Sequence, residues 1–400
     1  MKLLMKLLSL CFILILQINV NAQNPEFVKW EDLKIGAEQT NRYLHLLEGK
    51  RIGVVANHTS VVNNEHLIDF LISKGCDISK IFGLEHGFRG NISDGETIKD
   101  GKDVKTGIPI ISLYGKKKKA TSEDLQGLDI IVFDIQDVGV RFYTYLTSMC
   151  YMMEACAESS LPMLIFDRPN PNGFYVDGPI LDDKHKSFVG IHPIPIVHGM
   201  TLGEYALMAK GEKWIKNAEK CEIEIITVEN YTHSQTMSLP IKPSPNLPTH
   251  NSILLYPSLA LFEGTFISVG RGTSKPFEQI GHPDLDCYKH SFIPVSMPGI
   301  SKYPPQENKE CFGLDLSMFF KSEPDKLGSL DLEWIMKFYE DLKEKEDFFN
   351  AYFYKLSGVD ALRWQIYNGR TEEEIRKSWE DGLNRYKKIR VKYLLYPDFQ

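Results

Sequence analysis

The chain has 400 residues, of which 43% are hydrophobic, 25% charged and 11% aromatic. This composition is typical of a folded globular protein and excludes a coiled coil, a collagen-like chain and a mostly disordered chain. The 46 Lys and Arg residues and 53 Asp and Glu residues give a formal net charge of -7, which disfavours a general nucleic-acid binder. At about 100 to 200 residues per domain, this length predicts two or three domains.

The N-terminus has the pattern of a secretory signal peptide. Two lysines precede an apolar run over residues 7–16, and Val20 and Ala22 are the small residues expected at positions minus three and minus one of a cleavage site. The apolar run is shorter than the roughly 20 residues of a transmembrane helix. We therefore expect cleavage after residue 22 and export without a stable membrane anchor, with the periplasm favoured over the extracellular medium as the destination. The mature net charge would be -9, from 44 basic and 53 acidic residues.

Short apolar runs alternate with helical patterns from residue 50 to about residue 227, which is typical of an α/β fold with an open parallel sheet. The expected strands are 51–56, 81–84, 109–113, 128–133, 162–166 and 222–228. Apolar residues at helical spacing predict helices at 64–74, 141–158 and 201–216. Thr201 followed by Glu204 fits a capping box at the start of the last of these helices.

The composition changes after the last predicted strand. Residues 229–250 are rich in Pro, Ser, Thr and Asn, which predicts a long loop. Beyond this loop, short apolar runs are followed by polar helical patterns at 330–345 and 371–391. We place a domain boundary near residue 250, between an α/β domain at 23–250 and a smaller α+β domain at 251–400.

Several familiar motifs are missing. No GxGxxG follows the first strand, no true P-loop occurs, and no GxSxG elbow is present, so nucleotide-dependent enzymes and serine hydrolases are disfavoured. The cysteines are widely and irregularly spaced, and no pair of Cys or His residues has zinc-ligand spacing. We expect no cofactor and no metal. The basic run at 116–119 is interpreted as a solvated loop, in preference to a phosphate or polyanion patch.

Polar side chains follow four of the predicted strands: Asn57, Glu85, Asp134 and Asp167. The carboxyl ends of parallel strands share one edge of the sheet, where ligands bind in open α/β folds. Partial desolvation there raises a carboxyl pKa toward the range of a general acid. A single residue of this kind more often caps a helix or fixes a loop, but four together favour a site.

These segments resemble the exo-β-N-acetylmuramidases of the NamZ type over nearly the whole mature chain. The matching segments are RIGVVANHTS (51–60), LEHGFRG (84–90), SLYG (112–115), FDIQDVGVRFYTY (133–145), DRPNP (167–171), PIPIVHGMTLGE (193–204), PSPNLP (243–248) and YPSLALFEGTFISVGRGTSKPF (256–277). The resemblance implies a Rossmann-like N-terminal domain, a smaller C-terminal domain and an active site in the cleft between them. It also implies removal of terminal N-acetylmuramic acid from the non-reducing ends of peptidoglycan fragments.

The resemblance implies that Glu85 is a catalytic residue. Glycoside hydrolysis normally needs one carboxyl group that protonates the leaving oxygen and a second group that activates water or attacks carbon. We expect Glu85 as the general acid and Asp134 or Asp137 in the second role, with Glu263 in reserve. The substrate's own N-acetyl group is a further candidate, and the stereochemistry remains open.

Muramic acid carries a lactyl carboxylate, so an enzyme that recognises it should present a cation. Arg89, Arg141, Arg168 and Arg271 are the candidates, and each could instead be a structural ion-pair partner. The other expected substrate contacts are Asn57, His86, Gln136, Tyr143, Asp167, Asn246 and Glu263, with Phe142 and Tyr145 as further aromatic candidates. Two other functions remain possible at this point: a non-catalytic exported sugar-binding protein and a metal-dependent amidase or deacetylase.

Overall fold

A computed structural model describes residues 24–85, 87–89, 100–342 and 348–399. The predicted signal peptide and His86 lie outside the described residues. Within the described ranges, no helix is both long and apolar enough to cross a lipid bilayer.

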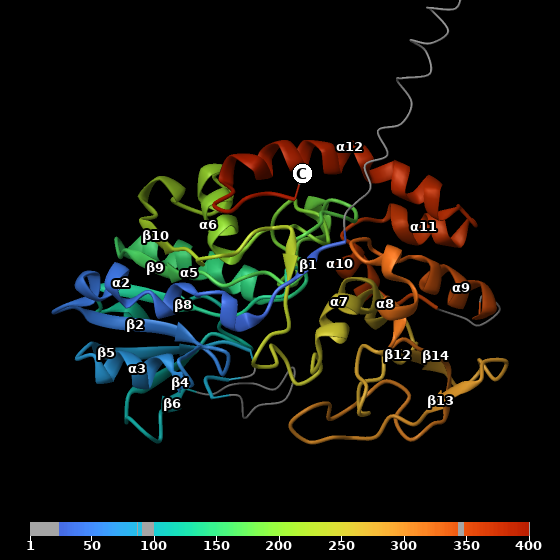
Figure 1. Cartoon of the computed structure of the whole chain (residues 1–400), viewed down its shortest axis with the longest axis horizontal. Coiled ribbons are helices and arrows are strands. Elements are labelled where there is room, and N and C mark those ends of the chain that lie inside the picture. Colours follow the sequence, from blue (N-terminus) through green and yellow to red (C-terminus); the bar gives the residue numbers. More distant parts are fainter. Residues whose placement is uncertain (1–23, 86, 90–99, 343–347, 400) are drawn as a thin grey trace, which may run out of the picture.

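A seven-stranded sheet forms the centre of the N-terminal part of the chain (Figure 1). The strand order is β10-β9-β8-β2-β5-β7-β6, and all neighbours are parallel except β6 and β7. The strands are β2 (Arg51–Ala56), β5 (Asp77–Gly83), β6 (Gly101–Lys102), β7 (Pro109–Ser112), β8 (Ile130–Asp134), β9 (Met163–Phe166) and β10 (Ile223–Ile226). All six predicted strands are confirmed: β2 has the predicted bounds, and the other five have shifted ends. The short edge strand β6 had no sequence signal.

Both faces of this sheet are buried, which explains why its strands are continuous apolar runs. Val55 and Phe133 point into the larger hydrophobic cluster, whereas their neighbours Val54 and Val132 point into a second cluster on the opposite face. The larger cluster includes residues of α4 (Ser122–Leu125), α5 (Tyr145–Ser159) and α6 (Leu202–Gly211), and the second includes residues of α2 (Thr40–Leu47) and α3 (Leu67–Ser73).

Two of the predicted helices begin later than the sequence indicated. The hairpin of β3 (Val61–Val62) and β4 (Glu65–His66) precedes α3, and residues 141–144 form an irregular segment before α5. The predicted capping box of α6 is present, with the Thr201 side chain accepting from the Glu204 amide at 3.2 Å.

The C-terminal part contains a small antiparallel sheet of order β12-β14-β13 and several helices. Its elements are α7 (His250–Leu259), β12 (Gln279–His282), β13 (His290–Phe292), β14 (Cys311–Asp315), α8 (Phe319–Ser322), α9 (Glu333–Leu342), α10 (Tyr352–Ser357), α11 (Ala361–Tyr367) and α12 (Glu372–Arg390). The predicted loop at 229–250 is irregular except for β11 (Gln235–Thr236), which pairs with β1 (Glu26–Phe27).

The two parts are joined by a common core. The larger hydrophobic cluster runs from Phe133 and Met149 in the N-terminal part to Phe338 and Trp379 in the C-terminal part. Figure 1 shows α12 lying along the molecule from α11 to α6. The chain then returns to the main sheet, where the Tyr396 hydroxyl donates to Oδ2 of Asp167 at 2.6 Å. Residues on either side of position 250 therefore bury one another.

Candidate active site

Glu85 lies just beyond the end of β5, and two hydroxyl groups hold its side chain. The Tyr114 hydroxyl donates to Oε1 at 2.5 Å, and the Thr144 hydroxyl donates to Oε2 at 2.6 Å. Tyr114 follows β7, the neighbour of β5 in the sheet, and Thr144 immediately precedes α5. The parallel order of the sheet thus brings together side chains that are far apart in the sequence.

The backbone of Glu85 is also held in place. The Tyr145 hydroxyl donates to the carbonyl oxygen of Glu85 at 3.2 Å and accepts from Nδ2 of Asn57 at 2.8 Å. Asn57 is fully buried at the end of β2, and its Oδ1 accepts from the amide of Thr59 at 2.8 Å. Asn57 therefore acts on Glu85 through Tyr145.

Glu85 lines a cavity of about 330 Å³ between the N-terminal and C-terminal parts. This volume is at the lower end of the range of about 300 to 1,000 Å³ for small-molecule sites. The lining residues are Glu85, Tyr114, Lys118, Phe142, Tyr143, Thr144, Phe188, Val189, Ser244, Asn246, Leu247, Tyr256, Glu263, Arg271, Phe277 and Tyr352. We call this space the Glu85 cavity.

A second carboxylate, that of Glu263, lines the Glu85 cavity. Its Oε1 accepts from Nη2 and Nε of Arg271, at 2.7 and 2.8 Å, and the Arg271 guanidinium lies 5.1 Å from the centre of the Phe277 ring. Within the described ranges, Oε2 of Glu263 makes no hydrogen bond. Burial raises the pKa of Tyr352 well above its usual range, and the carboxylates of Glu263 and Glu85 add to this shift. A tyrosine hydroxyl with its ordinary pKa is already protonated at neutral pH, and this shift does not change that state.

Aromatic rings form one wall of the cavity. Tyr256 makes edge-to-face contacts with Phe142 and Phe277, with ring centres 5.4 and 5.0 Å apart. The Tyr143 hydroxyl donates to the carbonyl of Pro243 at 2.7 Å. Asn246, in the loop that follows, donates to the carbonyl of Ile300 at 3.1 Å. Such a wall gives a sugar ring apolar surface, with polar groups at its edge.

The structure does not bring Asp134 or Asp137 to the Glu85 cavity. Asp134 is fully buried, and its two oxygens accept from Nε and Nη2 of Arg168 at 2.6 and 2.9 Å. Burial raises the pKa of Asp137 to about 7, and its Oδ2 accepts from the amide of Gly139 at 2.7 Å. Among the described residues, Glu263, the reserve candidate, is the carboxylate that lines the cavity together with Glu85.

Of the four candidate arginines, Arg271 lines the Glu85 cavity and the other three make contacts elsewhere. Arg89 pairs with Asp103 at 2.8 Å and with Asp69 at 3.3 Å. The buried Arg141 donates to the backbone carbonyls of Pro179, Ile194, Leu356 and Ser357, all at 2.8 to 2.9 Å. Its guanidinium thereby ties the N-terminal part to α10.

Two more of the predicted residues have structural contacts. Asp167 accepts from the hydroxyls of Thr201 and Tyr396 and from the amide of Gly203, so it fixes the start of α6. Burial raises its pKa to about 6. Gln136 donates to the carbonyls of Asp137 and Pro169, both at 2.8 Å.

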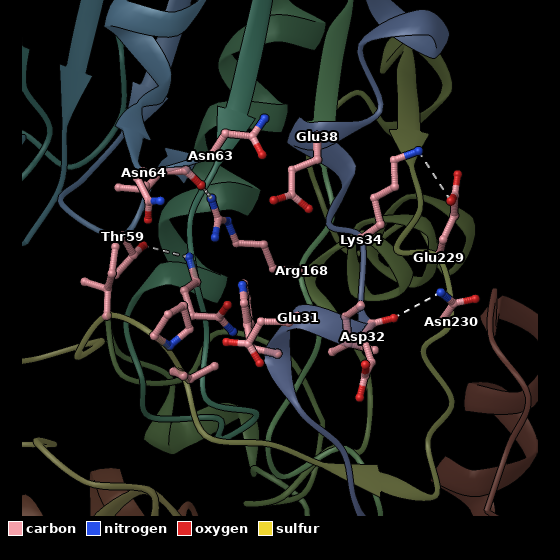
Figure 2. A pocket seen from close by; sticks show the side chains of 17 residues that line it. Glu31, Asp32, Lys34, Glu38, Thr59, Asn63, Asn64, Arg168, Glu229 and Asn230 are labelled. Atoms are coloured by element: carbon pink, nitrogen blue, oxygen red, sulfur yellow. Dashed lines mark hydrogen bonds and ion pairs between the residues drawn. The ribbon is translucent and has the colours of Figure 1, made fainter.

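A larger cavity of about 720 Å³ lies on the same edge of the sheet, near the ends of β2 and β8 (Figure 2). Figure 2 shows Arg168 between Asn63 and Asn64 on one side and Lys34 and Glu229 on the other. Its lining residues come from segments 30–38, 59–64, 136, 168 and 229–241, and Glu85 is not among them. The Arg168 guanidinium is already paired with Asp134, and this cavity lacks the hydroxyl-held carboxylate of the smaller one.

Sequence reasoning missed several lining residues. Tyr114 lies in the SLYG segment just after β7, and this position beside a strand end is a signal that could have identified it. Thr144 lies in the FYTY segment directly before α5 rather than at a strand end. Tyr352 has no such signal, because it reaches the cavity from a short helix about 270 residues after Glu85 in the chain. Lys118 could not be distinguished from the other three lysines of the run at 116–119. Among the described residues, no group of three His, Cys, Asp or Glu side chains is arranged to hold a metal ion.

Comparisons with known proteins agree over most of the chain. Residues 52–251 match the sequence model of exo-β-N-acetylmuramidase NamZ, N-terminal, and residues 254–396 match that of NamZ, C-terminal. The peptidoglycan β-N-acetylmuramidase NamZ of Bacillus subtilis strain 168 is 38% identical over 374 residues, which are 88% of this chain and 89% of that protein. Two crystal structures of DUF1343 family proteins from Bacteroides fragilis are similar. One is 48% identical with a TM-score of 0.85 and covers 92% of this chain and 99% of its own. The other is 26% identical with a TM-score of 0.75 and covers 91% and 99%. The chain therefore belongs to the exo-β-N-acetylmuramidase NamZ family.

Proposed function

We propose that this protein is an exo-acting glycoside hydrolase that releases terminal N-acetylmuramic acid from the non-reducing ends of peptidoglycan fragments. The observation that carries this proposal is the carboxyl group of Glu85, which faces a cavity that also contains the carboxylate of Glu263. Membership of the NamZ family and the name of the Bacillus subtilis relative support the substrate class.

Glu85 is the proposed general acid. Its carboxyl group gives a proton to the glycosidic oxygen as the bond from that oxygen to the anomeric carbon breaks. The hydroxyls of Tyr114 and Thr144 can each donate or accept a hydrogen bond, so they hold the side chain in both its ionised and its protonated form. Orientation of this kind lowers the activation barrier because the acid is already positioned for proton transfer to the leaving oxygen.

Glu263 is the proposed second group. Arg271 holds Oε1, which leaves Oε2 to take a proton from the water that attacks the anomeric carbon. The Tyr352 hydroxyl, which is protonated at neutral pH, is a donor for the sugar or for that water. Where the N-acetyl oxygen of the substrate attacks first, the same carboxylate can orient the amide and then activate the water.

The size of the cavity supports action at chain ends. A space of about 330 Å³ walled by both parts of the chain suits a single sugar with its substituents better than a run of polymer. We propose peptidoglycan-derived saccharides that carry a terminal MurNAc as the substrates. The sequence pattern of residues 1–22 supports export, with the periplasm as the proposed location.

The proposal is tested by incubating the mature protein with the disaccharide MurNAc-GlcNAc and measuring free N-acetylmuramic acid. Release supports the hydrolase. Binding of the disaccharide without any release would instead identify the alternative, an exported sugar-binding protein. Activity lost on chelation and restored by a divalent metal would favour the metal-dependent alternative.

A further inference from the structure

The four lysines at 116–119 have different surroundings in the structure and do not form a single solvent-exposed patch. Lys117 pairs with Asp124 at 3.1 Å, Lys119 pairs with Glu154 at 3.0 Å and Glu158 at 2.8 Å, and Lys116 is exposed. The remaining lysine of the run, Lys118, lines the Glu85 cavity.

Lys118 is held against an aromatic ring inside this cavity. Its Nζ lies 4.0 Å from the centre of the Phe188 ring, within the range of a cation–π interaction. Phe188 also lies near Tyr114, with ring centres 6.4 Å apart, and the Tyr114 hydroxyl contacts Glu85. The ammonium group is therefore placed on the wall of the cavity that carries the proposed acid.

Among the described residues, the charged side chains that line the cavity leave Lys118 without a counterion. The other basic side chain of the lining, Arg271, is paired with Glu263 at 2.7 Å. No ion pair joins Lys118 to any carboxylate within the described part of the chain. An ammonium on the wall of a cavity, with no carboxylate partner among the described residues, favours an anionic group of the ligand.

We infer that Lys118 binds the carboxylate of the lactyl substituent on the terminal sugar and so selects muramic acid over glucosamine. This inference rests on the proposed function, because it concerns the same cavity. Three of the candidate arginines make contacts elsewhere: Arg89, Arg141 and Arg168. The sequence analysis expected an arginine to bind the lactyl carboxylate, and we assign this role to Lys118 instead.

The test compares two substrates on four proteins. The substrates are MurNAc-GlcNAc and the same disaccharide with its lactyl carboxylate converted to the methyl ester, which removes the charge and keeps the shape. The proteins are the wild type, Lys118→Met, Lys118→Arg and the matched control Lys116→Met from the same run. The initial rate of sugar release gives KM and kcat for each pair.

The wild type should prefer the acid over the ester by about tenfold in KM, the scale of a hydrogen bond to a charged group. Lys118→Met should lose this preference by raising KM for the acid, with kcat and the KM for the ester little changed. Lys118→Arg should recover most of the preference, and Lys116→Met should match the wild type. A merely structural role would impair both substrates alike.

Two results would overturn the inference: a Lys118→Met variant that still prefers the acid, or one that loses activity equally on acid and ester. If the wild type hydrolyses neither substrate, the proposed function fails. Calorimetric titration with free N-acetylmuramic acid and its methyl ester then tests carboxylate binding by Lys118 independently of hydrolysis. Tighter binding of the acid that disappears in Lys118→Met would support the inference, whereas equal binding of acid and ester by the wild type, or no binding of either, would reject it.

Discussion

The Tyr114 hydroxyl lies 2.5 Å from Oε1 of Glu85, and the Thr144 hydroxyl approaches the other oxygen of the same carboxyl group. The two donors come from different elements, one after β7 and one before α5. Such a pair of contacts fixes the plane of the carboxyl group as well as its position.

Removal of the Tyr114 hydroxyl should impair catalysis more than binding. We expect Tyr114→Phe to lower kcat about tenfold, because the acid then samples unproductive orientations, with a smaller change in KM. Steady-state kinetics on MurNAc-GlcNAc would measure both. The control is Tyr303→Phe, since Tyr303 is 79% exposed. An unchanged kcat in Tyr114→Phe would show that this contact does not position Glu85.

Glu263 and Asp134 should respond differently to the loss of a carboxylate. Glu263→Gln should lower kcat by about a hundredfold or more, the scale of acid–base catalysis, with a normal thermal unfolding midpoint. Asp134→Asn should instead lower the free energy of unfolding by about 3 kcal/mol, because Arg168 would remain buried without its partner. A stable but inactive Asp134→Asn protein would instead indicate that Asp134 is a catalytic residue.

Asp137 should make the stability of the fold depend on pH. Its folded pKa of about 7 lies above the ordinary value of 3.8, so the folded state binds the proton more tightly than the unfolded state. The contribution of Asp137 to the free energy of unfolding is therefore fully present below about pH 4 and is lost as the pH rises through 7. Asp137→Asn removes this dependence.

Urea unfolding of both proteins between pH 4 and pH 8 measures this effect. Between pH 4 and pH 8, the free energy of unfolding of the wild type should fall relative to that of Asp137→Asn by on the order of 2 to 4 kcal/mol. The kcat of Asp137→Asn should stay near the wild-type value. A difference independent of pH would contradict the assignment. A hundredfold loss of kcat would place Asp137 in the reaction.

The C-terminal segment should stabilise the N-terminal part. The Tyr396 hydroxyl donates to Asp167 and accepts from the Val228 amide at 3.0 Å, and both partners are buried. Tyr396→Phe should therefore cost about 1 to 3 kcal/mol of unfolding free energy. The control, Tyr393→Phe, removes a hydroxyl that donates to Glu212 near the surface and should cost below about 1 kcal/mol. Equal losses in the two variants would contradict a specific role for Tyr396.

The six predicted strands of the sheet could be recognised in the sequence because each is a short apolar run that ends at or close to a polar residue, whereas the edge strand β6 is not such a run. Buried parallel strands have to be apolar on both faces, and RIGVVA before Asn57 is typical. The small C-terminal sheet could not be predicted in the same way. Its strand β14 alternates buried and partly exposed residues over only five positions, and its β12 is just as short.

The site could be predicted only in part. Glu85 was identifiable because it follows an apolar strand within a specific motif. Its proposed partner, Glu263, was only a reserve candidate because sequence reasoning favoured Asp134. The pairing of Asp134 with Arg168 depends on the adjacency of β8 and β9 rather than on the sequence around either residue. The orientation of Lys118 also depends on tertiary packing, since four consecutive lysines look alike in a sequence. Residue type limits the candidates, and the fold decides which of them face the cavity.

The most direct test compares release of free N-acetylmuramic acid from MurNAc-GlcNAc by the wild type, Glu85→Gln and Glu31→Gln. Glu31 is an exposed carboxylate of the larger cavity and serves as the matched control. The account predicts release by the wild type, a loss of about a hundredfold or more in Glu85→Gln and no loss in Glu31→Gln. Full activity in Glu85→Gln, or a loss confined to Glu31→Gln, would contradict it and move the active site away from the Glu85 cavity.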